Sequence, residues 1–358
     1  MTLGGLDVLY NVLQGLVDVV ALTVLARGVG RLGPVGIVAA TALSAILLAP
    51  LLPPLLEVDL CLIVRLLCWG IFVHGTLVFA GAAALGRGPR RLVWAGLSAV
   101  LVAIGVDAFF VEPHALELNR QTIAVRGLER PLTVAVVADL QTDHVTDHER
   151  RALELVMGAR PDLILFPGDL VQADPIARYQ AVQRDLNALF HEVGLSAPLG
   201  VVAVKGNVDW GPGRWQDVFD GLEVRASDTT VSYDLGPVVV TALSFDDGFD
   251  PLLVVPPLDD PQIIVAHGPD FALGRPGGEV LVAGHTHGGQ VQLPGIGPLM
   301  TLSRVPRPWA SGRTDLGERA LVVSRGVGME RHNAPRFRFL CRPEVVILDL
   351  VPMEPGRR

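Results

Sequence analysis

The sequence predicts a layered α/β domain with more than one sheet, preceded by an α-helical transmembrane bundle. Two observations predict this division. From residue 3 to about residue 111 the chain is almost entirely apolar, whereas beyond that point its composition is that of an ordinary soluble domain. In this second part, apolar runs first alternate with helical patterns and then follow one another closely, which is typical of α/β architecture.

Charge and cysteine content exclude several classes of protein. The formal net charge is −8 over 358 residues. A broad nucleic-acid surface needs a basic patch, so we expect no nucleic-acid partner. Cys61 and Cys68 fall in a predicted membrane segment and Cys341 lies near the C-terminus. This distribution gives neither a disulfide framework nor a CxxC metal site.

Four apolar segments are candidate membrane spans: 8–26, 32–56, 66–85 and 92–111. About 20 apolar residues cross about 30 Å of hydrocarbon, and each segment reaches or approaches that length. The first is the least secure, because Asp18 at mid-bilayer costs about 3 kcal/mol. We expect this segment either to lie in the interface or to hide Asp18 against neighbouring helices.

Loop charges predict the orientation of these segments. Arginines lie between the first and second segments and between the third and fourth, whereas Glu57 and Asp59 lie between the second and third. The positive-inside rule places the arginine loops in the cytoplasm. We therefore expect a multi-pass cell-membrane protein whose C-terminal domain is extracytoplasmic. The segments lack the features that line a transport pathway, so an anchor is the simpler interpretation.

The elements of the second part follow in order. A polar connector is expected over 112–130, then a strand over 132–138. A helix is expected over 146–160, with Thr146 as N-cap and Glu149 completing a capping box. After a strand at 163–166, Asp174-Pro175 opens a helix that runs to about residue 192. Further strands are expected at 201–204, 231–233, 238–243, 263–266, 280–282, 321–323 and 345–350.

Polar residues follow five of these strands. They are Asp139, Gly168-Asp169, Gly206-Asn207-Val208-Asp209, His267 and Gly284-His285-Thr286-His287. Ligands of open α/β sheets bind at the carboxyl ends of strands. A single Asp there is usually a turn former, but five such positions in succession are hard to explain as turns. Carboxylate, amide and imidazole groups together predict a site for one or two divalent metal ions.

These residues, in this order, resemble the calcineurin-like metallophosphoesterase family. Its signature is Asp-x-His, Gly-Asp, Gly-Asn-His-Asp/Glu, a lone His and Gly-His-x-His, and the resemblance covers about residues 131–351. The segments 324–328 and 342–344 are similar to the membrane-associated bacterial branch. The resemblance implies a phosphoesterase domain over 131–358, folded as a four-layer double β-sandwich with flanking helices.

The resemblance also implies the metal ligands. Asp139 and His287 would hold a first metal, with Gln141 at the position of a further ligand, and Asp169 would bridge both metals. The second metal would be held by Asn207, His267 and His285. Two divalent ions (Mn, Mg, Fe or Zn) about 4 Å apart would share a hydroxide that attacks the phosphorus atom.

Two positions depart from the family pattern. Gln141 replaces a histidine, so the first site would bind metal more loosely, favour Mg²⁺ or Mn²⁺ over zinc, or stay empty in isolation. Val208 replaces the histidine expected near the leaving group, and loss of a general acid costs about 10²–10⁴-fold in rate. Asp209, His144 or His332 could take over proton transfer, and we name Asp209 and His144 as catalytic candidates.

Two functions follow from this pattern. The first is a membrane-anchored, metal-dependent phosphoesterase acting on a phosphorylated small molecule or lipid, as a phosphate ester or pyrophosphate. A substrate with a good leaving group would tolerate the absence of a histidine at Val208. The alternative is a metal-binding pseudoenzyme with a sensing or scaffolding role. Six unchanged candidate ligands favour the enzyme.

Overall fold

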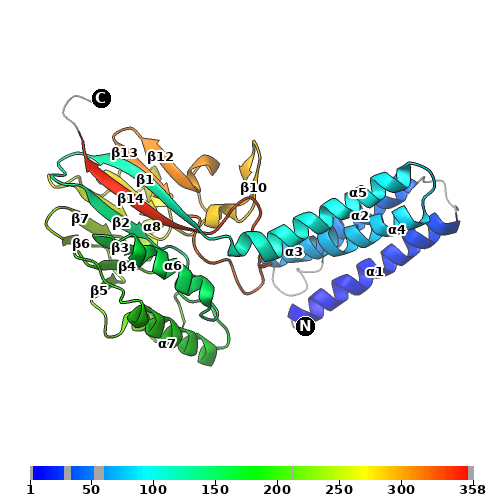
Figure 1. Cartoon of the computed structure of the whole chain (residues 1–358), viewed down its shortest axis with the longest axis horizontal. Helices are drawn as coiled ribbons and strands as arrows, with labels where there is room; N and C mark the ends of the chain where they lie inside the picture. The colour runs from blue at the N-terminus through cyan, green and yellow to red at the C-terminus, as the bar shows by residue number, and fades with distance from the viewer. Residues whose placement is uncertain (1–2, 28–33, 52–59, 212, 354–358) are drawn as a thin grey trace. The chain divides into compact units, whose positions relative to one another are not determined.

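The computed structural model describes residues 3–27, 34–51, 60–211 and 213–353. The chain divides into two compact units (Figure 1). The helical unit comprises Met1–Val111 with His332–Arg336, and the α/β unit comprises Glu112–Arg331 with Phe337–Arg358. Each unit has its own apolar core, and each is described by itself below.

The helical unit is built from long apolar helices. In order they are α1 (Leu3–Arg27), α2 (Pro34–Leu51), α3 (Leu60–Cys68), the π-helix η2 (Trp69–Gly75), α4 (Thr76–Leu85), α5 (Arg90–Val106) and η3 (Asp107–Val111). Three described stretches are long and apolar enough to cross a membrane: Gly5–Arg27, Leu60–Leu85 and Arg90–His114. The predicted span 32–56 is described as helix only over α2, and Glu57 and Asp59 lie outside the described residues.

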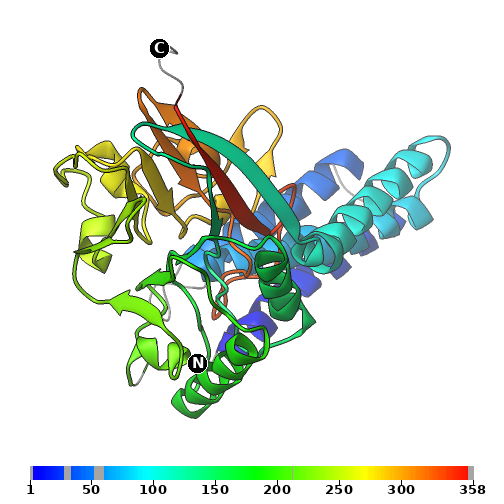
Figure 2. The ribbon, with the colours of Figure 1, turned by 60° about the vertical axis from the view of Figure 1, so that its left-hand side comes forward.

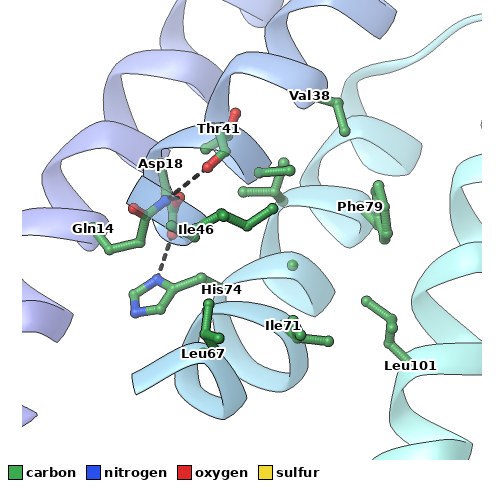
Figure 3. Close-up of a pocket in the computed structure, with 15 residues that line it drawn as sticks. Gln14, Asp18, Val38, Thr41, Ile46, Leu67, Ile71, His74, Phe79 and Leu101 are labelled. Carbon is green, nitrogen blue, oxygen red and sulfur yellow. Dashed lines mark hydrogen bonds and ion pairs between the residues drawn. The ribbon is translucent and has the colours of Figure 1, made fainter. Parts of the chain in front are cut away.

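A polar cluster holds Asp18 inside the helical unit. Its carboxylate Oδ2 lies 2.6 Å from His74 Nδ1, and its Oδ1 accepts a hydrogen bond from Gln14 Nε2 at 3.0 Å. Figure 3 shows these side chains of α1 and η2 pointing toward one another beside a mainly apolar cavity of about 210 Å³. The expectation that Asp18 hides against neighbouring helices is therefore confirmed, since only 6% of the residue is exposed.

The α/β unit contains two six-stranded sheets. The first has the order β1 (Glu117–Val125), β14 (Glu344–Pro352), β2 (Leu132–Val136), β3 (Leu163–Phe166), β4 (Val201–Val204), β5 (Val224–Ser227). The second has the order β12 (Gly312–Leu316), β13 (Arg319–Val323), β9 (Val280–Ala283), β8 (Gln262–Val265), β7 (Val239–Ala242), β6 (Val231–Asp234). A small hairpin pairs β10 (Gln292–Leu293) with β11 (Gly297–Pro298).

Most of these elements lie where the sequence predicts them. The segment 112–130 is a correction, because the predicted polar connector contains strand β1, which pairs in parallel with β14. Helix α6 (Asp147–Gly158) has the predicted Thr146–Glu149 capping box. Helix α7 (Ile176–Glu192) begins one residue later than expected, with Pro175 at its N-cap.

Apolar clusters explain why the two sheets and their helices stay together. One buried cluster combines side chains of both sheets, among them Val134 and Leu165 of the first and Val240 and Val265 of the second. Another joins the opposite face of the first sheet to α6 and α7, which lie along that sheet (Figures 1 and 2). Full burial of one Val or Leu side chain contributes about 1.5–3 kcal/mol.

Candidate metal centre

The fold gathers the predicted ligands at the ends of parallel strands. Strands β2, β3 and β4 run parallel in one sheet, and β8 and β9 run parallel in the other. The predicted ligands lie two or three residues past these ends: Asp139 after β2, Asp169 after β3, Asn207 after β4, His267 after β8 and His285 after β9. The two sets meet, since His267 Nε2 lies 3.4 Å from Asp169 Oδ2.

Three lone pairs converge on one point of this site. His267 Nδ1 donates to the Pro167 carbonyl at 2.8 Å, and His285 Nε2 donates to the Leu302 carbonyl at 3.1 Å. In neutral rings the other nitrogens, His267 Nε2 and His285 Nδ1, therefore carry no proton. They lie 3.2 Å apart and 2.7 and 2.8 Å from Asn207 Oδ1. Three acceptors this close repel one another, and a cation bound among them would remove that repulsion.

A second group of atoms lacks ordinary partners. Among the described residues, the buried atoms Gln141 Oε1 and His287 Nε2 have no hydrogen-bond partner. Buried polar atoms are nearly always bonded, so an orphaned pair indicates an ion or water. Ligand atoms of Asp139, Asp169 and His267 also lie within 4.8 Å of one another. The donor set of two carboxylates, two amides and three imidazoles fits a divalent metal centre.

Burial shifts the pKa values of these groups in the direction that favours their neutral forms. Desolvation raises the pKa of Asp139 to about 8. It raises the pKa of Asp169 as well, and the charges of Asp209 and Asp139 raise it further. Burial lowers the pKa of His267 and His287 well below the usual value, so both rings are neutral. Neutral imidazole is the form that binds metal, and a cation would restore the carboxylates to their charged form.

The backbone of the site is held in an uncommon conformation. Five of the seven predicted ligands have positive φ angles between 40° and 69°: Asp139, Gln141, Asp169, His285 and His287. This left-handed region is disfavoured for residues other than glycine and costs about 1–3 kcal/mol at each position. Such strain clusters at functional sites, where the surrounding structure holds each side chain in place.

Comparison with known proteins identifies the family. The family model described as calcineurin-like phosphoesterase matches residues 132–289. The uncharacterized metallophosphoesterase YkuE of Bacillus subtilis is 30% identical over 268 residues, covering 68% of this chain and 88% of YkuE. The chain belongs to the calcineurin-like phosphoesterase family. The phosphodiesterase YaeI of Escherichia coli is 27% identical over 277 residues, covering 73% of this chain and 98% of YaeI. As a calcineurin-like phosphoesterase, the protein is a metal-dependent phosphoester hydrolase.

Asp209, predicted as a general acid of this phosphoesterase, is a buried residue whose carboxylate binds backbone N–H groups. Its carboxylate accepts the backbone N–H groups of Asp169, Leu170 and Gly206 at 2.8–2.9 Å. The residue is only 3% exposed. These contacts give the carboxylate a structural role, and its catalytic role stays a prediction.

The other proton donors considered from the sequence differ in position. The imidazole of His144 is exposed, and its Nδ1 lies 2.9 Å from Asp143 Oδ1. Its catalytic role stays a prediction. His332 belongs to the helical unit. The backbone N–H of Val208 donates to Asp169 Oδ1 at 2.9 Å. The side chain of Val208, at the position of the family's histidine, is aliphatic and cannot transfer a proton.

The sequence pattern did not predict several residues that lie in the phosphoesterase site. Phe249 stands edge-on to the His285 ring, with centroids 4.8 Å apart. Arg338 is fully buried and donates to the carbonyls of Gly326, Gly328 and Cys341. Gln172 and Glu330 bond the side chain of Gln141. None follows a predicted strand directly in the sequence, so no strand-end signal marked them.

Proposed function

We propose that the protein is a membrane-anchored phosphoesterase with a binuclear metal centre. Asp139, Gln141 and His287 would hold one ion, with Asp169 between the two ions. Asn207, His267 and His285 would hold the other. The observation that carries this proposal is the convergence of three unprotonated acceptors within 2.7–3.2 Å. The two sheets and their helices would form the four-layer double β-sandwich of the family.

The side chains would divide the work at this centre. Divalent cations bound there supply Lewis acidity toward a phosphoryl group. The carbonyls of Pro167 and Leu302 fix the tautomers of His267 and His285, so that an unprotonated nitrogen of each ring faces the centre. Phe249 packs edge-on against both rings, with its centroid 6.0 Å from that of His267 and 4.8 Å from that of His285. No nucleophilic side chain is needed in this chemistry.

The substrate would be a phosphodiester, pyrophosphate or aryl-type ester with a good leaving group. The aliphatic side chain of Val208 cannot protonate a departing alkoxide, which penalises poor leaving groups most. Three helices with the length and composition of membrane spans support a substrate at the membrane, such as a lipid-linked or envelope phosphate. We further propose that the α/β unit is extracytoplasmic, on the basis of the arginine-bearing loops.

The alternative is a pseudoenzyme that binds metal and senses or scaffolds. Val208 and Gln141 favour it, because each departs from the family pattern at a position of the reaction chemistry. The alternative predicts metal binding without turnover. A hydrolysis assay therefore distinguishes the two proposals, whereas a metal-binding assay does not.

The deciding experiment is hydrolysis by the purified full chain in detergent. Bis-aryl and mono-aryl phosphates would be tested with Mn²⁺, Mg²⁺, Zn²⁺ or EDTA. We expect metal-dependent turnover that Asp169→Asn abolishes. The matched control is Asp185→Asn, an exposed carboxylate on α7, which should retain full activity. Metal bound without turnover of any ester would favour the pseudoenzyme.

A further inference from the structure

A carboxylate and two primary amides lie together beside the proposed first metal position. Glu330 Oε2 accepts a hydrogen bond from Gln141 Nε2 at 3.1 Å, and Glu330 Oε1 accepts one from Gln172 Nε2 at 2.7 Å. Gln141 Nε2 also donates to Gln172 Oε1 at 3.0 Å. The three side chains come from the segments after β2, β3 and β13, so the fold itself assembles the group.

This group decides which way the Gln141 amide faces. A primary amide has two N–H donors and one carbonyl acceptor. Both donors of Gln141 are used, one by Glu330 and one by Gln172. Turning the amide over would place its oxygen against two other acceptors and leave buried partners unsatisfied. The carbonyl oxygen is therefore the atom turned away, and it is buried without a partner among the described residues.

The two orienting residues are themselves fixed. Gln172 Oε1 accepts the backbone N–H of Arg331 at 2.8 Å, and the backbone N–H of Gln172 donates to the Thr142 carbonyl at 3.0 Å. The backbone N–H of Glu330 donates to Gln290 Oε1 at 2.9 Å. The arrangement is thus held on several sides before any metal binds.

We propose that Glu330, together with Gln172, is a positioning residue that presents the Gln141 carbonyl oxygen as a metal ligand. This inference rests on the proposed metal centre. It also assigns the class of cation, because carbonyl and carboxylate oxygens suit Mg²⁺ and Mn²⁺ whereas imidazole suits Zn²⁺. Gln141 is then a functional ligand for a hard cation, and its replacement of the family's histidine does not remove metal binding.

The test is a double-mutant cycle on metal affinity, measured on the full chain in detergent. Binding of Mn²⁺ would be followed by the EPR signal of the free ion for the parent, Glu330→Gln, Gln141→His and the double variant. Removing a group that orients a ligand typically weakens metal affinity about 10–100-fold. We expect that loss for one Mn²⁺ ion in the parent background and less than about threefold loss in the Gln141→His background.

Two further variants separate orientation from charge and from folding. Glu330→Asp keeps the negative charge but shortens the side chain, so it should reproduce most of the loss if orientation matters. Glu192→Gln, an exposed carboxylate paired with Arg150, should change nothing. Gln141→His should shift the preference of the same metal site from Mn²⁺ toward Zn²⁺.

The outcomes are distinguishable from those of the enzyme proposal, because binding is measured without substrate. Equal losses in both backgrounds, or full affinity in Glu330→Asp with reduced affinity in Glu330→Gln, would show that Glu330 acts through its charge and would overturn the inference. Unchanged affinity in Glu330→Gln would overturn it too. Coupling without hydrolysis would support this inference and count against the enzyme.

Discussion

The carboxylate of Asp209 accepts the backbone N–H of Asp169 at 2.8 Å. The loop after β4 thereby holds the loop after β3 at the residue we propose to lie between the two metals. A second oxygen of the same carboxylate accepts the N–H of Leu170 at 2.9 Å. The position next to the missing family histidine is therefore occupied by a structural anchor.

We expect Asp209→Asn to destabilise the protein. The amide would turn an N–H group toward backbone donors and leave at least one of them unsatisfied, at about 1–3 kcal/mol for each group. Thermal unfolding of the variant in detergent should therefore show a lower Tm, with metal affinity reduced as well. A variant with the parent's Tm that lost activity only on poor leaving groups would instead restore Asp209 as a proton donor.

Gly206→Ala should weaken metal binding by displacing the side chain of Asp169. A Cβ at Gly206 would lie 2.1 Å from Asp169 Oδ1 and 2.3 Å from Asp169 N, so the proposed bridging carboxylate must move. Overpacking of this kind costs about 1–3 kcal/mol. The matched control is Gly158→Ala in α6, where no atom lies within 4 Å of the new Cβ. We expect the control to keep parental Tm and metal affinity; equal behaviour of the two variants would contradict the argument.

Asp139 should contribute a loss of stability to the metal-free protein as the pH rises. Burial raises the pKa of Asp139 to about 8, far above about 3.9 in an unfolded chain. Between these values Asp139 binds more protons in the folded state than in the unfolded state, so its contribution to stability falls with increasing pH. Stabilisation by Mn²⁺ should grow over the same range, because the metal needs the ionised carboxylate.

The share of this pH dependence that comes from Asp139 can be measured. Tm would be measured between about pH 5 and about pH 8 with EDTA and with Mn²⁺, for the parent and for Asp139→Asn. We expect a shallower fall of the metal-free Tm in the variant, together with weaker stabilisation by Mn²⁺. Parallel curves for the two proteins would show that Asp139 does not titrate in this range.

Val208→His should widen the range of substrates. The backbone N–H that Val208 donates to Asp169 is retained in the variant, so the new imidazole is added to an intact loop. A general acid contributes about 10²–10⁴-fold, and the gain should fall on alkyl esters with poor leaving groups. The ratio of kcat/KM for alkyl and aryl phosphates would be compared with that of Val208→Leu. An unchanged ratio would place the leaving group elsewhere.

The sequence predicted the strands and ligands that depend on local patterns. Strands such as β3 and β4 are short, fully buried apolar runs, and ligands follow their ends at nearly constant spacing. Strand β1 was not predicted because its first six residues alternate between half-buried and exposed and include Glu117 and Arg120. Among the described strands, its one neighbour in the sheet is β14, which comes much later in the chain.

The remaining parts of the site depend on contacts between distant segments. Glu330 contacts Gln141 because the loop after β13 lies against the loop after β2. Hydrophobic periodicity in the sequence does not predict contacts between such distant loops. The same holds in the helical unit, where His74 and Asp18 come from separate helices. Residue type indicated that these groups were unusual, but only the tertiary structure shows their partners.

The pairing of β1 with β14 constrains the order in which the α/β unit can be completed. Because β14 lies between β1 and β2, the first sheet keeps an open edge at β2 until the last described strand has been synthesised. Strand pairing between such distant segments is slow, and open edges invite pairing with other chains. A ribosome that stalls before β14 would therefore release a chain whose ligand loops exist but whose sheet is unfinished, a natural substrate for chaperones and proteases.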